Sequence, residues 1–426
     1  WEDWGSQGRT CLFIKLDKSI NLNNKMNKKK LLTIFTLFFI INISSKGFEV
    51  SAVFETPPVQ TKGDAADDPA FWLNKEDPSN SIIFGTDKRS GIYAYDLKGD
   101  LITFTEAGKI NNIDLRTIDL DHKADGTISK QPYTFLIGTN RSLNTIDLWV
   151  FFDGGLALSM FTRSVKLKNK NLRPGQKIRI NDKTNAEFLI PENPDFRILS
   201  ESNIYGVCAG IHPKYGFVAF VTEDRGPNVE IYYLGANGLE LFGSFSNGGE
   251  SEGCVFDDEN LTLIISEENV RGNLKAYKFD QNFDLIEDPV IIDSRNGNIS
   301  GDPEGVSIYK TNTKEGYIVL SSQGDSKFNL YNREFPYEFI NSFKIVDNKN
   351  IDGVSDTDGI ETINFNIDCD DFSYYCVGLF DSVSKTFPKG IMIAQDGYNY
   401  DGDDKKNQNF KLISFKEILD NLDVTR

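Results

Sequence analysis

Polar and apolar residues alternate with a period of two along most of this chain, which is the pattern of half-buried β-strands. Runs rich in Ile, Val, Phe and Tyr end in a small polar residue, a charged or glycine-containing turn follows, and the alternation then resumes. This order predicts pairs of strands joined by hairpins. Only residues 415–422 show a clear helical pattern.

The hairpin pattern occurs six times, at intervals of roughly 45 to 80 residues. The copies are SIIFGTDKRSGIYAYDL from Ser81, YTFLIGTNRSLNTIDLWVF from Tyr133, FVAFVTEDRGPNVEIYYL from Phe217, LTLIISEENVRGNLKAYKF from Leu261, YIVLSSQGDSKFNLYNR from Tyr317, and GIMIAQDGYNYDG from Gly390 with its partner NFKLISF from Asn409. Such spacing suits four-stranded propeller blades, so we expect an all-β, six-bladed β-propeller over residues 47–426. A pair of β-sandwiches is the alternative, but it would not explain the repetition. Residues 164–202 are expected to form an irregular insertion between blades.

The beginning of the chain has a different composition. Residues 1–25 are expected to be an upstream leader, because the first Met is Met26. Three lysines, Lys28 to Lys30, then precede a 13-residue apolar run, Leu31 to Ile43, and two serines. This pattern predicts a signal peptide at residues 26–46, because the run is too short to span a bilayer. We therefore expect a secreted or periplasmic protein.

The charge of the chain narrows the possible partners. The 426 residues include 46 Lys and Arg against 63 Asp and Glu, a formal net charge of −17. Loss of residues 1–46 removes eight basic and three acidic groups, which changes the net charge to −22. So negative a protein repels nucleic acid and anionic membrane surfaces. We expect a monomer that binds neither, and with only two histidines its chemistry is expected to depend on carboxylates.

Four cysteines follow the predicted signal peptide. Cys369 and Cys376 bracket an Asp-rich segment and are candidates for a disulfide. Cys208 and Cys254 lie in apolar, strand-like segments, where we expect buried thiols. The chain has no C-x-x-C motif, so a zinc site is not expected.

Acidic turns precede several of the predicted strands. These turns are GDAADDP at Gly63, GESEG at Gly249, GDPEG at Gly301 and DGVSDTDG at Asp352, with further acids in SEE at Ser266 and in QDG at Gln395. A single acidic turn is most often a solvated loop. In a propeller, however, the loops that enter the innermost strands converge on one face, where the carboxylates would repel one another unless cations lay between them. An all-oxygen set of ligands favours Ca²⁺ over zinc or copper.

Basic side chains follow the same strands, among them Lys88, Arg89 and Arg141. Alone, each is more simply a solvated turn residue. Beside bound cations they would form a pocket for a multiply charged anion, and the planar guanidinium of Arg141 suits phosphate.

These motifs together resemble the β-propeller phytases, which are secreted, calcium-dependent, six-bladed enzymes that release phosphate from myo-inositol hexakisphosphate (phytate). The resemblance runs in order from about Glu55 to Phe415. Its motifs are DAADDPAFWL at Asp64, DKRSG at Asp87, GKINNIDLR at Gly108, TNRS at Thr139, IYG at Ile204, SEG at Ser251, SEE at Ser266, DPEG at Asp302, SSQGDS at Ser321, DGVSDTDGI at Asp352, and AQDG at Ala394 with NQNFKL at Asn407. One such motif is weak evidence, but eleven in register are strong.

The resemblance implies a role for particular residues. Calcium ligands would be Glu55, Asp67, Asp68, Glu252, Glu268, Asp302, Glu304, Asp352, Asp358, Asp396 and Asn399. Phosphate would bind to Lys88, Arg89, Arg141 and Gln323, assisted by Asn111 and Asn112. Catalysis would involve Asp67, Glu252, Glu304, Asp358, Tyr205 and Arg141. The family has one phosphate site for cleavage and a second for affinity.

One segment departs from the family. After the third predicted hairpin strand the family commonly has a Lys-Glu pair, whereas this chain has Glu223, Asp224 and Arg225. Arg225 is a candidate replacement for the lysine. The missing Lys-Glu pair affects the expected contacts of the affinity site.

The sequence thus predicts a phosphoric monoester hydrolase of the 3-phytase type, in which calcium assists the attack of water at phosphorus. Two alternatives remain open. A six-bladed calcium-dependent lactonase or esterase would need one catalytic ion and no set of phosphate-binding Lys and Arg. A non-catalytic, calcium-stabilised binding propeller would not need the central carboxylates.

Overall fold

The computed structural model describes residues 47–75, 78–124, 127–153, 158–160, 166–167, 170–171, 190–268, 272–365 and 386–425. All of them belong to one compact unit, Lys46–Arg426. The predicted leader and signal peptide, and Cys369 with Cys376, lie outside the described residues. Within the described residues, no helix has the length and apolar character required to cross a membrane.

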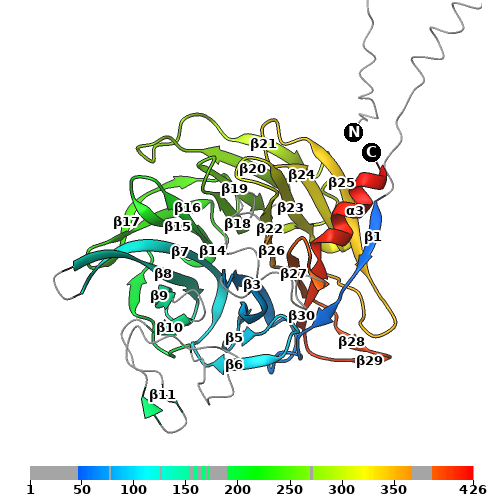
Figure 1. Cartoon of the computed structure of the whole chain (residues 1–426). Coiled ribbons are helices and arrows are strands. Elements are labelled where there is room, and N and C mark those ends of the chain that lie inside the picture. The colour runs from blue at the N-terminus through cyan, green and yellow to red at the C-terminus, as the bar shows by residue number, and fades with distance from the viewer. Residues whose placement is uncertain are drawn as a thin grey trace, which may run out of the picture. The chain divides into compact units, whose positions relative to one another are not determined.

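Six antiparallel sheets form a ring, which confirms the predicted six-bladed propeller (Figure 1). Blade 1 contains β3 (Ala66–Trp72), β4 (Ile82–Asp87), β5 (Gly91–Tyr95) and β6 (Leu101–Thr105). Blade 2 contains β7 (Ile110–Ala124), β8 (Thr127–Asn140), β9 (Thr145–Asp153), β10 (Leu158–Met160) and β13 (Phe196–Leu199). Blade 3 contains β14 (Ile204–His212), β15 (Gly216–Glu223), β16 (Asn228–Gly235) and β17 (Gly238–Ser246).

The remaining blades follow in chain order. Blade 4 contains β18 (Ser251–Asp257), β19 (Thr262–Glu267), β20 (Asn273–Lys278) and β21 (Val290–Ser294). Blade 5 contains β22 (Pro303–Lys310), β23 (Gly316–Ser322), β24 (Lys327–Asn332) and β25 (Phe339–Val346), and β1 (Phe48–Ser51) joins β25 in parallel. Blade 6 contains β26 (Ile360–Ile363), β27 (Ile391–Asp396), β30 (Asn409–Ser414) and β2 (Phe54–Glu55).

Short elements complete the structure. They are β11 (Lys166–Leu167), β12 (Lys170–Asn171), β28 (Tyr400–Asp401), β29 (Asp404–Lys405), two 3₁₀ turns, η1 (Pro78–Asn80) and η2 (Gln323–Asp325), and the helix α3 (Phe415–Thr425). The predicted C-terminal helix is therefore confirmed and three residues longer than expected. The insertion between blades 2 and 3 is less irregular than expected, because β13 pairs with β9.

The six predicted hairpins are the two middle strands of the six blades. In blade 6 these strands are β27 and β30, and the β28–β29 hairpin lies between them in the chain. Strand β2 pairs with β30 although β3 begins blade 1, so the last sheet contains both an N-terminal and a C-terminal strand. This shared sheet closes the ring without a free edge between the first and last blades.

The hydrophobic core is divided between the blades. Among the described residues there are six buried apolar clusters, each formed by two neighbouring blades. Trp72 and Trp149, for example, share the cluster of blades 1 and 2. Strands that are buried on both faces need apolar residues at nearly every position, which explains runs such as Ile82 to Phe84.

A disulfide joins two inner strands, Cys208 of β14 and Cys254 of β18, with 5.6 Å between the Cα atoms. The expectation of buried thiols is therefore wrong. The two cysteines are 46 residues apart in the chain, and only the ring arrangement brings their strands side by side.

Candidate active site

The site lies at one end of the inner strands. The second residue of five successive inner strands carries a polar side chain: Asp67 on β3, Asn111 on β7, Tyr205 on β14, Glu252 on β18 and Glu304 on β22. In each of these strands, the pairing with the next strand shifts register just after this residue. Such a bulge turns a side chain out of the normal alternation, and here it recurs at the start of five blades.

Glycines follow three of these five side chains and allow neighbouring inner strands to approach closely. Gly206, Gly253 and Gly305 follow Tyr205, Glu252 and Glu304 directly. A Cβ atom on Gly253 would lie 2.2 Å from the carbonyl oxygen of Glu304, and one on Gly206 would lie 1.9 Å from that of Glu252. Each glycine therefore allows the next functional residue to approach closely.

The polar residue in the next-to-last position of each second strand has a defined role. These residues are Thr86, Thr139, Thr222, Ser266, Ser321 and Gln395. Their side chains bond to backbone groups near the start of an inner strand: Thr222 Oγ1 accepts from Gly206 N at 2.8 Å, and Thr139 Oγ1 donates to Tyr205 O at 2.6 Å. The recurring polar residue of the sequence pattern thus fixes the backbone of the site.

A second set of site positions lies two residues after each of these polar residues. Its members, here called the loop positions, are Lys88, Arg141, Asp224, Glu268, Gln323 and Gly397. Four of the six were predicted as site residues. Asp224 was not, although its place in the repeat could have revealed it. Arg225, the candidate replacement for lysine, has a side chain 84% exposed.

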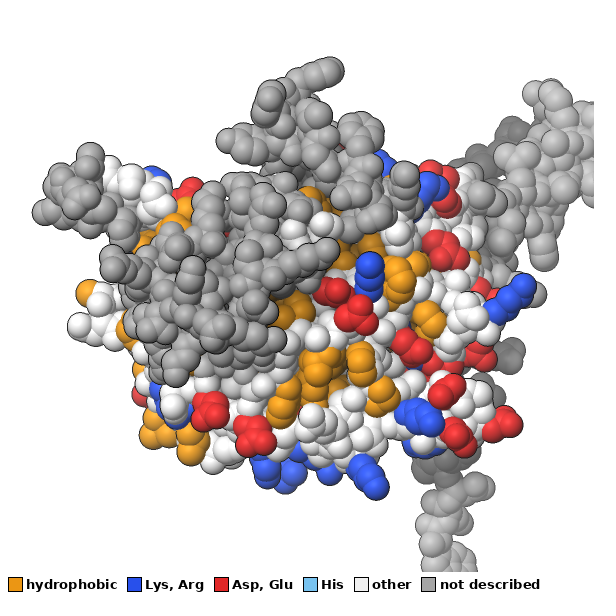
Figure 2. All heavy atoms as spheres, turned by 60° about the horizontal axis from the view of Figure 1, so that its bottom comes forward, with side chains coloured by type: hydrophobic (Ala, Val, Ile, Leu, Met, Phe, Trp, Pro, Cys, Tyr) orange, Lys and Arg blue, Asp and Glu red, His pale blue; other side chains and the backbone are white. Residues whose placement is uncertain are grey.

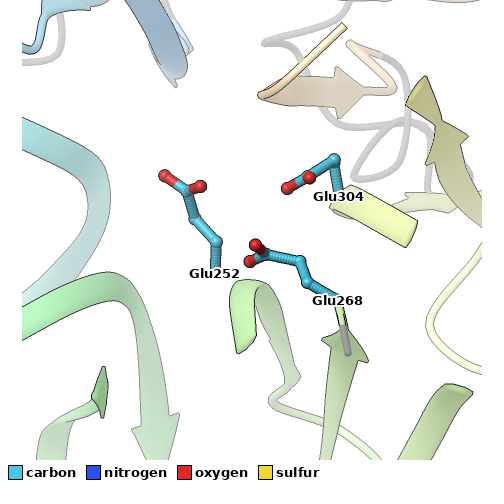
Figure 3. Close-up of side chains that lie close together, drawn as sticks. All are labelled: Glu252, Glu268 and Glu304. Carbon is cyan, nitrogen blue, oxygen red and sulfur yellow. The ribbon is translucent and has the colours of Figure 1, made fainter. Parts of the chain in front are cut away.

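Three carboxylates meet at the centre of the site. Glu252, Glu268 and Glu304 each bring one oxygen within 4.8 Å of the others, and Figure 3 shows the three side chains converging. One Glu268 oxygen and one Asp67 oxygen are buried without a hydrogen-bond partner. Buried carboxylate oxygens without partners are costly, and a cation bound between these groups would relieve that cost.

The carboxylates have strongly shifted pKa values. Burial and the neighbouring Glu268 raise the pKa of Glu252 to about 7, and burial and Asp67 raise the pKa of Asp358 to about 8. Burial also raises the pKa of Glu304 well above its usual value, with Glu268 and Glu252 adding to the effect. A bound cation would have to displace protons from these groups.

Basic and neutral residues surround this centre. Lys88 Nζ lies 2.9 Å from Asp64, 3.1 Å from Asp67 and 3.0 Å from Asp358. Burial opposes the charge of Lys88, but these carboxylates outweigh it and hold its pKa above the ordinary value. Lys88 therefore keeps its positive charge. Gln323, another neighbour, donates to Asp358 at 2.5 Å.

Arg141 lies beside Tyr205. Its guanidinium is 5.4 Å from the centre of the Tyr205 ring, donates to Asn111 Oδ1 at 3.0 Å and lies 3.5 Å from an Asp224 oxygen. Asn111 in turn donates to Glu252 at 2.5 Å. Burial, followed by the nearby Glu252, raises the pKa of Tyr205, so its hydroxyl stays protonated and donates to Glu252.

These side chains surround a cavity of about 430 Å³. Its lining includes Lys88, Tyr205, Glu252, Glu304, Gln323 and Asp358. A second cavity of about 320 Å³ is lined by residues from all six inner strands and includes Asp68 and Glu361. Asp68 therefore lies in the central channel, where its carboxylate accepts from Ile113 N at 3.0 Å.

Other predicted ligands are grouped around Lys411, outside the cavity. Its ammonium contacts Glu55 at 2.5 Å, Asn399 at 3.3 Å and Asp396 at 3.6 Å, and it also pairs with Asp352. One Asp396 oxygen is buried without a hydrogen-bond partner.

Three predicted residues have other surroundings. Asp302 pairs with Arg295 rather than with the central carboxylates. Arg89 is exposed. Asn112 is buried and accepts from Asn111 Nδ2 at 2.8 Å.

Comparisons with known proteins agree with this geometry. The family model "Phytase" matches residues 22–168 and 180–426. A "3-phytase" of Bacillus subtilis (strain 168) is 32% identical over 384 residues, which cover 88% of this chain and 86% of that protein. The structure of an auxiliary nutrient binding protein from Bacteroides thetaiotaomicron matches 85% of this chain and 76% of its own, with a TM-score of 0.44 and 11% identity, too low a similarity to support a conclusion. From the family match and the 3-phytase relative, we conclude that this chain belongs to the phytase family.

Proposed function

We propose that this phosphoric monoester hydrolase removes phosphate from myo-inositol hexakisphosphate with calcium ions held by the central carboxylates. Family membership supports the reaction. The observation that carries the calcium proposal is the convergence of Glu252, Glu268 and Glu304, combined with buried oxygens of Glu268 and Asp67 that have no hydrogen-bond partner. A polyanionic substrate cannot approach such a cluster unless cations reverse the local charge.

The donor set fits calcium. Every side chain that would hold the ions offers oxygen. These side chains are Glu252, Glu304 and Asp358 at the cavity, Glu268 beside Glu252 and Glu304, Asp67 beside Lys88, Asp68 in the channel, and Glu55, Asp352, Asp396 and Asn399 around Lys411. Ca²⁺ accepts six to eight such ligands in irregular geometry. Asp302 is the weakest member of the predicted set, because Arg295 already neutralises it.

The protein's own residues bind and orient the substrate. Lys88 supplies a fixed positive charge at the cavity, and Arg141 offers a planar guanidinium that is already held by Asn111 and Tyr205. Gln323 and the protonated Tyr205 hydroxyl can donate hydrogen bonds to phosphate oxygens. Calcium, when bound, supplies positive charge beside the transferring phosphoryl group and acidifies nearby water.

We also propose that the protein acts outside the cytoplasm. The Cys208–Cys254 disulfide supports this, because disulfides persist mainly in oxidising compartments. The predicted signal peptide at residues 26–46 would deliver the chain there.

Glu304→Gln tests the calcium proposal, because its effect on the melting temperature should have opposite signs with and without calcium. In excess chelator, the variant should melt at a higher temperature than the wild type, because a neutral amide avoids the cost of either ionising or protonating the buried Glu304 carboxyl among its acidic neighbours. In calcium, it should melt lower and need at least about tenfold more Ca²⁺ for half-maximal phosphate release, because a ligand is missing. Glu315→Gln, at an exposed position, is the control. The same melting shift in both conditions would contradict calcium binding at Glu304.

A further inference from the structure

A hollow of about 580 Å³ lies beside the catalytic cavity. It is lined by Pro58, Lys62, Gly63, Lys405, Lys406 and Asn407. Gly63, Lys405 and Lys406 also line the catalytic cavity. The two spaces therefore share a wall, and that wall carries positive charge in a protein that is otherwise strongly negative. In Figure 2, by comparison, acidic and basic side chains are interspersed over the face shown.

The backbone that carries these lysines is held in place. Lys62 lies in the loop between β2 and β3, where Asn407 Nδ2 donates to Val59 O at 2.9 Å. Lys405 ends β29, opposite Tyr400 of β28, and Lys406 N donates to Asn399 O at 2.9 Å. Lys62 precedes Lys405 and Lys406 by more than 300 residues, and direct hydrogen bonds join the two segments.

The ammonium groups are only weakly neutralised. Lys406 lies 3.6 Å from Asp404 and 3.8 Å from Asp401, whose side chains are 83% and 84% exposed, and exposed pairs of this kind contribute little. Lys405 lies 4.5 Å from the centre of the Tyr398 ring. For Lys62 the described residues show no ion pair. Lys88, by contrast, already has three carboxylate partners.

The other side of the site has the opposite charge. At the loop position of blade 3, Asp224 pairs with Arg141. Close by, Glu250 adds another acidic side chain: its backbone oxygen accepts from Glu268 N at 3.0 Å, and its carboxylate accepts from Arg225 N at 2.9 Å. Apart from Arg141, this side adds only acidic groups near the centre, so a second phosphate would be attracted more strongly on the side of blades 6 and 1.

We propose that Lys62, Lys405 and Lys406 form a subsite, here called the lysine rim, for phosphate groups of the substrate that are not being cleaved. The inference rests on the proposed function. The inositol ring of the substrate carries phosphates on all sides, so it cannot place all of them among the central carboxylates. The remaining phosphates need positively charged side chains further out. The lysine rim should then govern the affinity for highly phosphorylated inositols, and not the chemical step.

The test is a variant with Lys62→Gln, Lys405→Gln and Lys406→Gln. Its KM for inositol hexakisphosphate should rise about tenfold in saturating calcium, with kcat changed less than twofold, because the lost contacts bind phosphates remote from the reaction. The inhibition constant of inorganic phosphate, which can occupy the cleavage site alone, should stay within about twofold. The variant with arginine at the same three positions should keep the wild-type KM.

A matched control removes three lysines elsewhere on the surface, with Lys98→Gln, Lys278→Gln and Lys314→Gln. It should leave KM within about twofold, because it changes net charge equally without touching the rim. An unchanged KM in the rim variant, an equal rise in the control, or a parallel rise of the phosphate inhibition constant would overturn the subsite. If the wild type released no phosphate, the proposed function would fail instead, and calorimetric binding of hexakisphosphate to wild type and rim variant would still test the rim.

Discussion

At the scale of single residues, Arg141 is the proposed phosphate-binding side chain with the best-defined geometry. Its guanidinium is fixed from three sides, by Asn111, Asp224 and the Tyr205 ring. Such preorganisation favours bidentate contact with a phosphate and reduces the conformational entropy lost on binding.

Replacement of Arg141 by Lys should therefore lower kcat/KM by a factor on the order of ten to a thousand. The charge remains but the planar fork is lost. The melting temperature should move little, because the Asp224 pair is partly exposed. Steady-state kinetics with hexakisphosphate check this, and wild-type kinetics in the variant would make Arg141 an ordinary surface residue.

At the scale of strands, the bulge at the start of five of the six inner strands is the feature that brings the side chains of the site together. It turns Asp67, Tyr205, Glu252 and Glu304 toward one another, and the following glycine or the small polar residue of the next strand holds it in place.

Gly253→Ala should disturb two functional residues at once. The new Cβ would meet the Glu304 carbonyl oxygen at 2.2 Å, so β18 and β22 must separate and Glu252 must move relative to Glu304. We expect a loss of about 2 kcal/mol or more in stability and a weaker response to calcium. Gly243→Ala is the matched control, because a Cβ there meets nothing within 4 Å. Equal melting curves for the two variants would contradict this prediction, because they would show that β18 and β22 accommodate the new Cβ atom without loss of stability.

Glu361, in the second position of β26, lines the channel and not the cavity. Burial and the nearby Asp114 raise its pKa to about 8. An unfolded glutamate ionises near its ordinary pKa, while the folded one keeps its proton up to about pH 8. The stability from this group is complete below the ordinary pKa and is lost as the pH rises through 8.

Glu361→Gln, which cannot ionise, should therefore gain in melting temperature relative to the wild type as the pH is raised from 5 to 9. The gain corresponds to at most about 1.4 kcal/mol per pH unit between the two pKa values. Thermal melts across this range check it, with Glu338→Gln at an exposed position as control. A difference independent of pH would contradict the raised pKa.

Much of the fold could be predicted because strand alternation and hairpin turns are local signals. The six hairpins and helix α3 were confirmed. Contacts between segments that are distant in the chain produce much weaker signals in the sequence. No sequence signal near Cys208 indicates that it pairs with Cys254. Asp224 can be recognised as a site residue only from its position in the repeat, two residues after Thr222. The lysine rim joins residues 62 and 405, which no local pattern connects.

At the scale of the whole molecule, the ring explains why an acidic protein can act on a polyanion. Blades 1, 4 and 5, and the loop that enters blade 6, bring Asp67, Glu252, Glu268, Glu304 and Asp358 to one end of the axis, where a cation could be held by several blades at once. Under the calcium proposal, the same cations would serve folding and function, because ions that bind only the folded state stabilise it by about 2.7 kcal/mol per site at a hundredfold excess over Kd.

The most direct test of the calcium account is phosphate release from inositol hexakisphosphate by the wild type, together with its melting temperature, in excess EDTA and after Ca²⁺ or Mg²⁺ is restored. The account predicts that activity and melting temperature both fall in EDTA and both recover with Ca²⁺. Mg²⁺ should restore them poorly, because it demands a tighter octahedral geometry. Full activity in excess chelator with an unshifted melting curve would contradict the proposal that calcium bound to the central carboxylates makes this enzyme work.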